Sequence, residues 1–135
     1  MTACEVKIIS DQGAYCSVGI YVQSRAVIHT CGGYKIPNNS VDSYFVYTNN
    51  ILTGAFRGFG GPQVAIAMEQ QMDILAERLG MDPVDLRLKN AVDHGDTTPR
   101  GQVLDNCGRG MKETLLQAAR KADWYRKRKE YEAFN

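Results

Sequence analysis

The residues best suited to chemistry in this sequence lie in one glycine-rich segment, residues 53–63, which reads Thr-Gly-Ala-Phe-Arg-Gly-Phe-Gly-Gly-Pro-Gln. Glycines permit positive backbone φ and a close approach of the backbone to a ligand. Pro62 suits the first turn of a helix, where free amides and the helix dipole favour an anion. Arg57 adds a positive charge, and Phe59 offers an aromatic face to a planar molecule. These features predict a loop that binds an anionic, partly aromatic ligand.

A purely structural interpretation of the same segment is also possible. The glycines could form a tight turn whose Phe56 and Phe59 pack into the core. Two known phosphate-binding loops are excluded by the spacing. No Gly-Lys-Ser/Thr follows, as a Walker loop requires, and the third glycine of a dinucleotide fingerprint is missing. The residue types alone leave a ligand loop and a structural turn open.

The elements that must position this loop follow from the hydrophobic pattern. Residues 5–10 and 41–48 are rich in β-branched and aromatic side chains, which predicts strands. A helix is predicted over residues 18–29, with Arg25 and His29 on one face. The residues that recur there at three- and four-residue intervals are Val18, Tyr21, Val22, Arg25, Ala26 and His29. The composition of residues 36–39 predicts a turn.

Helices are predicted on the C-terminal side of the loop. The long helix begins at Pro62 and ends before Gly80, and Asp82 is the N-cap of a second helix that runs to about Asn90. Residues 93–110 are predicted to form a loop, and a C-terminal helix follows with a break near Asp123. In the long helix we expect Val64, Met68, Met72, Leu75 and Leu79 to face the core and Glu69 and Glu77 to face solvent.

Composition places the chain among ordinary globular domains. It has 135 residues, of which 44% are hydrophobic and 23% charged, which excludes disordered and collagen-like classes. No apolar run is long enough to span a membrane, and the N-terminus lacks a signal-peptide pattern, so a cytoplasmic protein is expected. Cys4, Cys16, Cys31 and Cys107 have no metal-site spacing and are expected to be reduced thiols.

The charge distribution argues against a dedicated nucleic-acid binder. The formal net charge is only +1, although residues 109–135 hold eight basic and four acidic side chains. Such a run is typical of the solvated face of a helix, and residues 126–129 give only a weak indication of nucleic-acid binding.

Two strands with several helices predict an α+β fold. Two strands are too few for a free-standing sheet, so residues 1–135 are expected to be an incomplete piece of a larger domain. Residues 1–61 would hold the strands and the ligand loop, and residues 62–135 the helical part.

The loop and its flanking blocks resemble the xanthine dehydrogenase/aldehyde oxidase family of molybdenum hydroxylases. The similarity begins with residues 55–63 and extends in register over roughly residues 5–122. The matching blocks are Asp11-Gln-Gly-Ala-Tyr15, Ser24-Arg-Ala-Val-Ile-His29, Tyr34-Lys-Ile-Pro-Asn38, Val46-Tyr-Thr-Asn49, Ala76-Glu-Arg-Leu-Gly-Met-Asp-Pro83, Leu86-Arg-Leu-Lys-Asn90, Gly95-Asp-Thr-Thr98 and Gly101-Gln.

This resemblance implies a fold, a cofactor and a reaction. The chain is similar to an internal piece of the family's molybdopterin-binding region, a two-layer sandwich of a small mixed sheet and helices. Family members hydroxylate an activated carbon of an N-heterocycle or aldehyde, with oxygen taken from water, on a molybdenum–molybdopterin cofactor. Electrons then leave through iron–sulfur clusters and often FAD, which would lie on other domains or subunits.

The resemblance also assigns roles to residues. Ala55, Phe56, Arg57 and Gly58 would line the cofactor, with Arg57 at the molybdenum centre. Phe59 would stack on the substrate ring. Arg25 matches an arginine that stabilises negative charge developing on a carbonyl-bearing, purine-like heterocycle, although as an exposed helix residue it could instead pair with a carboxylate. His29 and Gln63 would support the site without touching substrate.

The family's catalytic glutamate region and the glutamine-bearing loop near the apical molybdenum ligand have no counterpart in this sequence. General acid–base work needs a carboxylate within hydrogen-bond reach of the reacting group, so the chain alone is expected to be inactive. Its partners would be the remaining domains or subunits of the enzyme and a small heterocyclic or aldehyde substrate. The alternative is a truncated relative that serves as a non-catalytic binding or assembly module.

Overall fold

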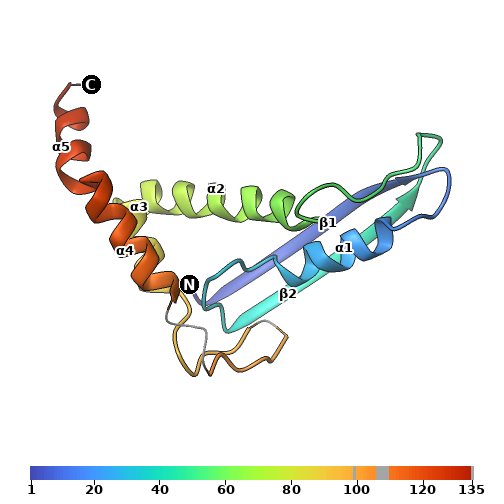
Figure 1. The fold of residues 1–135 in the computed structure, drawn as a ribbon, viewed down its shortest axis with the longest axis horizontal. Helices are drawn as coiled ribbons and strands as arrows, with labels where there is room; N and C mark the ends of the chain where they lie inside the picture. Colours follow the sequence, from blue (N-terminus) through green and yellow to red (C-terminus); the bar gives the residue numbers. More distant parts are fainter. Residues whose placement is uncertain (99, 106–109, 135) are drawn as a thin grey trace.

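The computed structural model describes residues 1–98, 100–105 and 110–134, so Cys107 lies outside the described residues. The elements in chain order are β1 (Ala3–Gly13), α1 (Gly19–Ile28), β2 (Asn38–Tyr47), α2 (Gly61–Leu79), α3 (Pro83–Asn90), α4 (Gly110–Ala122) and α5 (Trp124–Phe134). Figure 1 shows the two strands running obliquely along α2, with α1 near the N-terminal end of α2 and with α4 and α5 as an arm at its C-terminal end. This arrangement confirms an α+β piece. None of the helices described is long and apolar enough to cross a membrane.

The two strands are parallel neighbours in one small sheet. Their register runs from Ala3 beside Asn38 to Gly13 beside Tyr47, with an irregularity between Asp11 and Gly13. A parallel pair needs a crossover connection, which α1 provides. Where a mixed sheet was expected, the described strands form only a parallel pair. The predicted turn at residues 36–39 is wrong in its second half, because Asn38 and Asn39 already pair with β1.

One face of the sheet is covered and the other is open. Along β1, residues 4, 6, 8 and 10 are half-buried, whereas residues 3, 5, 7 and 9 are exposed. Helix α1 covers the first face, where the Gln23 amide donates to Ser43 Oγ and, over 3.3 Å, to the backbone oxygen of Tyr44. On the open face the Lys7 ammonium lies 5.4 Å from the centre of the Tyr44 ring. The layers are therefore helix on sheet, with nothing from the described residues on the far side.

The core lies between α2, α3 and the segment that follows α1, and it is rich in sulfur. Its buried members are Cys31, Tyr34, Ile36, Met68, Met72, Ala76 and Leu86, and Met1, Cys4, Leu75, Met81 and Met111 pack against them. All five methionines of the chain are in this set. The predicted stripe of α2 is confirmed at Met68 and Met72 but wrong at Leu79, which is 61% exposed. Ala76 takes its place, because residues 68, 72 and 76 share one helix face.

The predicted helix boundaries around Gly80 are confirmed. Gly80 ends α2 with φ 60°, and the Asp82 carboxylate caps α3 by accepting from Val84 N over 2.8 Å. The predicted break near Asp123 separates α4 from α5, and Asp123 has φ 50°. The arm is held on α3 by Trp124 Nε1, which donates to Asp82 Oδ2 over 3.0 Å.

A hydrogen-bonded cluster joins α2 to α3, and it corrects the expectation for Glu69. The hydroxyl of Tyr34, 2% exposed, donates to Glu69 Oε1 over 2.8 Å, and Arg87 Nε donates to Glu69 Oε2 over 2.9 Å. Arg87 also reaches Asp73 over 2.7 Å and the backbone oxygen of Glu69 over 3.1 Å. Burial, with the hydrogen bond to Glu69, raises the pKa of Tyr34. Glu69 is thus a structural partner, whereas Glu77 is exposed as expected.

Replacing Arg87 by alanine is expected to lower the free energy of unfolding by about 1–3 kcal/mol, because several charge-assisted hydrogen bonds are lost. The carboxylates left behind are 45% and 63% exposed at Glu69 and Asp73, so water can rehydrate them and keep the loss moderate. Urea unfolding measures it, with the exposed Arg78→Ala as the control, for which a change within about 0.5 kcal/mol is expected. Equal losses in both variants would show that the cluster does not fix α3 on α2.

Candidate functional site

The glycine-rich loop ends in two overlapping turns that lead into α2. Phe59 N donates to Phe56 O over 2.9 Å, and Gly61 N donates to Gly58 O over 3.1 Å. Gly58 and Gly60 have φ 93° and 89°, and Phe59 between them has φ 52°. The other two glycines of the segment have ordinary φ values. The positive φ of Phe59 was not predicted; it costs a side-chain-bearing residue about 1–2 kcal/mol and is a kind of strain found at binding sites.

This turn lies directly against α1. A Cβ atom on Gly60 would be 2.3 Å from the carbonyl oxygen of Val22, and one on Gly61 would be 3.8 Å from the His29 ring. Residues 22, 25, 26 and 29 share one face of a helix, so Arg25 lies on the face of α1 that meets the loop. The fold thus brings Arg25 and the loop, which are thirty residues apart in sequence, to the same place.

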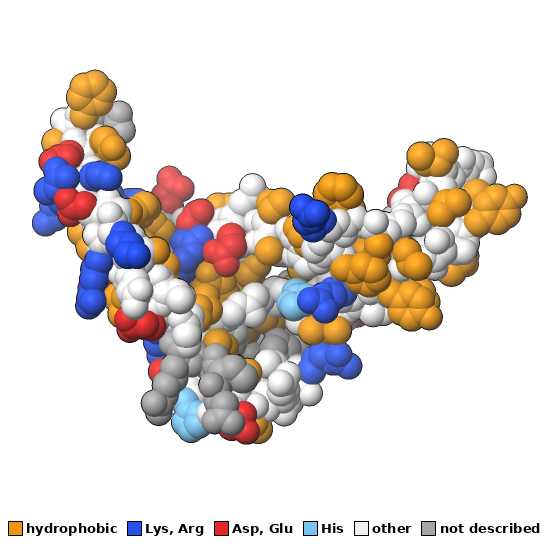
Figure 2. Space-filling model, viewed as in Figure 1, with side chains coloured by type: hydrophobic (Ala, Val, Ile, Leu, Met, Phe, Trp, Pro, Cys, Tyr) orange, Lys and Arg blue, Asp and Glu red, His pale blue; other side chains and the backbone are white. Residues whose placement is uncertain are grey.

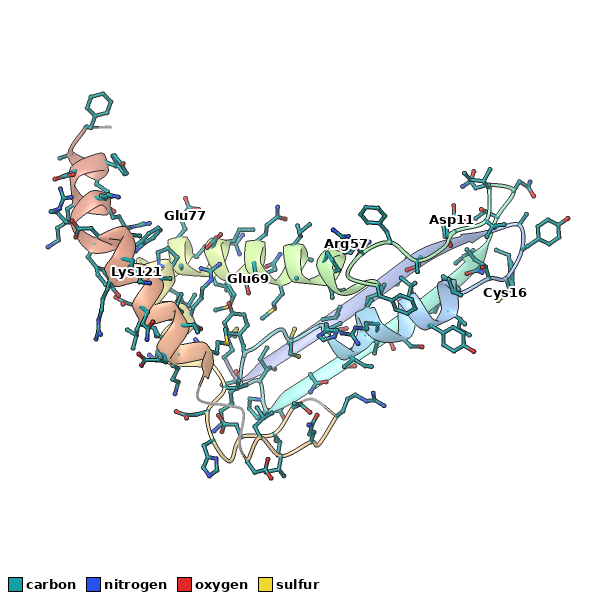
Figure 3. All side chains as sticks on the ribbon, viewed as in Figure 1. Asp11, Cys16, Arg57, Glu69, Glu77 and Lys121 are labelled. Atoms are coloured by element: carbon teal, nitrogen blue, oxygen red, sulfur yellow. The ribbon has the colours of Figure 1, made fainter. Side chains whose placement is uncertain are left out.

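The side chains of the loop point away from the core. Residues 55–58 are exposed, Phe56 by 87%, and Phe59 is half-buried. Packing of Phe56 into the core, the structural interpretation of the segment, is therefore wrong for that residue. Figure 3 shows Arg57 on the loop at the end of α2 opposite Glu77. The loop presents Ala55, Phe56 and Arg57 as an open wall.

The remaining predicted residues lie close by. Arg25 is exposed and forms no ion pair within the parts of the chain that the structure describes, so the expected alternative of a carboxylate partner is not observed. His29 is half-buried beside Gly61, in keeping with a packing role. Gln63 lies in the first turn of α2 and lines a groove beside β1. Figure 2 shows basic side chains and a histidine together near the C-terminal end of α1.

The end of β1 anchors the segment that enters the loop. Thr53 N donates to Gln12 O over 3.0 Å, and Thr48 N donates to Gly13 O over 3.1 Å. Gly13 has φ 78°, and a Cβ there would lie 2.2 Å from the backbone oxygen of Ile51. The backbones are therefore in direct contact, which fixes where the loop begins.

Gln12 connects this anchor to α1, and sequence reasoning did not single it out. It is 1% exposed, and its amide nitrogen donates to Tyr15 O over 3.1 Å. Its Oε1 points to the start of α1, since a Cβ on Gly19 would lie 2.4 Å from it, and it has no hydrogen-bond partner among the described residues. Gln12 thus lies in contact with the start of α1, which carries Arg25, and accepts a hydrogen bond from the start of the segment that carries the loop.

Asp11 ties the ends of β1 and β2 together. Its carboxylate accepts from the Thr48 hydroxyl over 2.6 Å, from the Asn50 amide and, over 2.8 Å, from Gly13 N. These hydrogen bonds, chiefly those from Thr48 and then Asn50, lower the pKa of Asp11. A carboxyl whose pKa is lower in the folded chain stabilises the fold above its unfolded pKa of about 4 and loses this effect as pH falls through the folded pKa.

Asp11→Asn is therefore expected to destabilise the chain at neutral pH and to do so less as the pH falls. The measurement is urea unfolding of both proteins at several pH values between about 6 and about 3, which spans the range in which an ordinary aspartate titrates. A gap between the two proteins that stays constant over this range would contradict a role for the Asp11 charge.

The electrostatics at the loop favour an anion. The loop ends at the N-terminus of the 19-residue helix α2, whose first turn contains no acidic residue, so its positive dipole end is uncompensated there. Arg57 and Arg25 add two exposed positive charges beside it. Within the described ranges no three His, Cys, Asp or Glu side chains gather as metal ligands.

Comparison with known proteins shows which proteins the chain is similar to. The family model of the molybdopterin cofactor-binding domain matches residues 1–91. The chain is 49% identical over 122 residues to the nicotinate dehydrogenase large molybdopterin subunit of Eubacterium barkeri, and the match covers 90% of this chain and 28% of that protein. It is 46% identical over 90 residues to one subunit of a probable xanthine dehydrogenase from Bacillus subtilis, with 67% of this chain and 12% of that protein covered.

The fold is also similar to that of a solved oxidoreductase. The crystal structure of the aldehyde oxidoreductase from Desulfovibrio desulfuricans superimposes with a TM-score of 0.85 and 34% sequence identity, over 94% of this chain and 14% of that one. The chain thus spans less than a third of the length of each of these proteins.

Proposed function

Because the chain belongs to the molybdopterin cofactor-binding domain family, we propose that it supplies one wall of the molybdenum–pterin site of an oxidoreductase that hydroxylates a purine-like N-heterocycle with water-derived oxygen. The family resemblance seen in the sequence is confirmed by these comparisons. The observation that supports the proposal best is the backbone contact between Gly60 and Val22, since it places the glycine-rich loop against the helix that carries Arg25. Residues 1–135 would form part of this domain, with residues 1–61 ending in the loop and residues 62–135 as its helical part.

The residues of the loop fit an anionic cofactor. Arg57 is exposed at the positive end of α2, the backbone at Gly60 lies close to α1, and residues 55–58 are exposed. Ala55, Phe56, Arg57 and Gly58 would hold the cofactor, with Arg57 beside the molybdenum. When bound, the molybdenum–pterin group supplies the redox centre of the reaction. The loop would orient that group and exclude water from its protein side.

Arg25 and Phe59 would bind the substrate. The guanidinium of Arg25 carries a fixed charge that can hold a ring carbonyl or carboxylate and stabilise negative charge that develops on it. Phe59, half-buried and strained, would present its ring to a planar heterocycle. The relatives named for nicotinate and xanthine are consistent with an N-heterocycle as the substrate. The similarity to an aldehyde oxidoreductase leaves an aldehyde as the alternative substrate.

The rest of the machinery would be supplied from outside this chain. A carboxylate for proton transfer, iron–sulfur clusters and FAD would lie on the remaining domains or subunits, with which the chain would assemble. The chain alone would be inactive. A cytoplasmic location stays a prediction. A second candidate function is a non-catalytic assembly module, which the open, partly apolar surfaces of the chain would also suit.

The test is metal and pterin analysis of the chain, first alone and then co-expressed with the remainder of the Eubacterium barkeri subunit, from which the matching segment has been removed. We expect molybdenum and pterin only in the co-expressed complex. A stable complex that contains neither would favour the assembly module. The control is the same complex carrying Arg57→Ala, which should contain less cofactor at unchanged subunit ratio.

A further inference from the structure

The structure contains a second surface of interest, an apolar groove of about 860 Å³ beside β1. One wall is formed by residues 1–9, that is, the N-terminal residues and the first part of β1. The other wall is α2, and Thr30 and Ile36 also line the groove. The α2 residues on this wall are Gln63, Val64, Ala67, Met68, Gln71 and Leu75. They recur at three- and four-residue intervals and so form one stripe along the helix.

The wall on the β1 side is a free strand edge. Within the described ranges β1 pairs only with β2, so the backbone groups along its other edge have no strand partner. An edge of this kind is a template for one more strand. Odd- and even-numbered residues of the segment 1–9 both line the groove. This is expected when a groove runs along the edge of a strand rather than over one of its faces.

The dimensions of the groove match a strand. Residues 3–9 of β1 extend over about 20 Å at about 3.3 Å per residue. The stripe from Gln63 to Leu75 extends over about 18 Å at about 1.5 Å per residue. A strand of about six or seven residues, paired with β1 about 4.8 Å away, would place alternate side chains against this stripe. Cys4, which packs against the core that includes Met68, shows that the half-buried face of β1 points to the α2 side.

We propose that this groove receives an extended strand from the rest of the enzyme, which adds to the free edge of β1 and packs alternate apolar side chains on α2. The strand would come from outside this chain, because the chain spans only 28% of its nicotinate dehydrogenase relative and 14% of the solved aldehyde oxidoreductase. The inference thus rests on the proposed function. The outward side chains of that strand would be polar, because the neighbouring positions on β1 are the exposed Glu5 and Lys7. Lys7 already contacts the Tyr44 ring, so a basic side chain is expected beside Glu5.

The experiment is co-purification of the full chain with the remainder of the Eubacterium barkeri subunit, comparing Ala67→Glu with Ala65→Glu. Both alanines are exposed on α2, but only Ala67 lines the groove. We expect the recovered complex to fall at least tenfold for Ala67→Glu and to stay unchanged for Ala65→Glu. We also expect the backbone amides of residues 3–9 in the wild-type chain to exchange hydrogen at least tenfold more slowly in the complex.

Several outcomes would overturn the inference. Recovery of both variants to the same extent would do so, as would the absence of any wild-type complex, or amide exchange in residues 3–9 that does not change on assembly. A wild-type chain that dimerises alone, with Ala67→Glu monomeric, would assign the groove to a second copy instead. The exchange measurement uses the wild-type chain and so does not depend on how the variants fold. A complex that forms through the groove but contains no molybdenum would contradict the proposed function and leave this inference intact.

Discussion

Replacing Gly60 by alanine is expected to destabilise the chain by about 2–4 kcal/mol and to abolish cofactor retention in the assembled enzyme. Two costs add at this position. Gly60 has φ 89°, which side-chain-bearing residues rarely adopt, and its added Cβ would lie 2.3 Å from the backbone oxygen of Val22. Because a backbone oxygen cannot rotate away as a side chain can, the turn or α1 must shift. The displacement would separate the loop from Arg25.

The matched control is Gly54→Ala in the same loop. Gly54 has an ordinary φ value, and a Cβ there would meet no atom within 4 Å. Its substitution is expected to change the free energy of unfolding by no more than about 0.5 kcal/mol and to leave molybdenum content unchanged. Urea unfolding of the chain and metal analysis of the complex measure the two effects. If Gly60→Ala were as well tolerated as Gly54→Ala, the contact between loop and α1 would not be what holds the site.

The second large effect is expected for Arg25→Gln in the assembled enzyme. If the guanidinium stabilises charge that develops on the substrate, kcat/KM for a heterocycle with a ring carbonyl or carboxylate should fall by about 10²–10³, the loss typical of removing one such donor. A simple aldehyde has no second group for Arg25 to hold, so its kcat/KM should fall much less. The measurement is therefore the ratio of kcat/KM for the heterocycle to kcat/KM for the aldehyde, compared between Arg25→Gln and the wild-type enzyme.

Stability should not change in this variant, because Arg25 is exposed and has no ion-pair partner within the described residues. The control is Arg78→Gln, an exposed arginine at the far end of α2 from the loop. An equal loss for both substrates in Arg25→Gln would indicate a general structural role, and no loss for either would remove Arg25 from the site.

The sequence predicted those features of the fold that depend on local signals. Pro62, Gly80 and Asp82 fix helix boundaries through their own backbone preferences, and the structure has these boundaries at or within one residue of the predicted positions. The extension of β2 to Asn38 was missed, because only the distant Ala3 makes that residue a strand residue. The cluster around Glu69 was missed for the same reason, since its partners Tyr34 and Arg87 are far away in sequence.

The candidate site also has some features that local sequence signals predict and others that depend on tertiary contacts. The glycine-rich loop can be recognised from composition, but its neighbour Arg25 could be linked to it only through the family resemblance. The physical reason for their proximity, the contact of Gly60 with Val22, is a tertiary one. Gln12 carried no local signal at all. A buried glutamine with an unused oxygen becomes visible only when the surrounding segments are in place.

The sulfur-rich core has a consequence for the chemical durability of the chain. Oxidation converts methionine to its sulfoxide, which is polar and poorly accommodated among apolar neighbours. All five methionines meet in this one core, where Met72 is fully buried and Met1, Met81 and Met111 are only partly covered. A peroxide would attack the outer three first, and each sulfoxide would loosen the packing that protects the next sulfur. Damage in this chain would therefore advance inward from the surface, and intact Met72 would mark molecules whose interior has not yet opened.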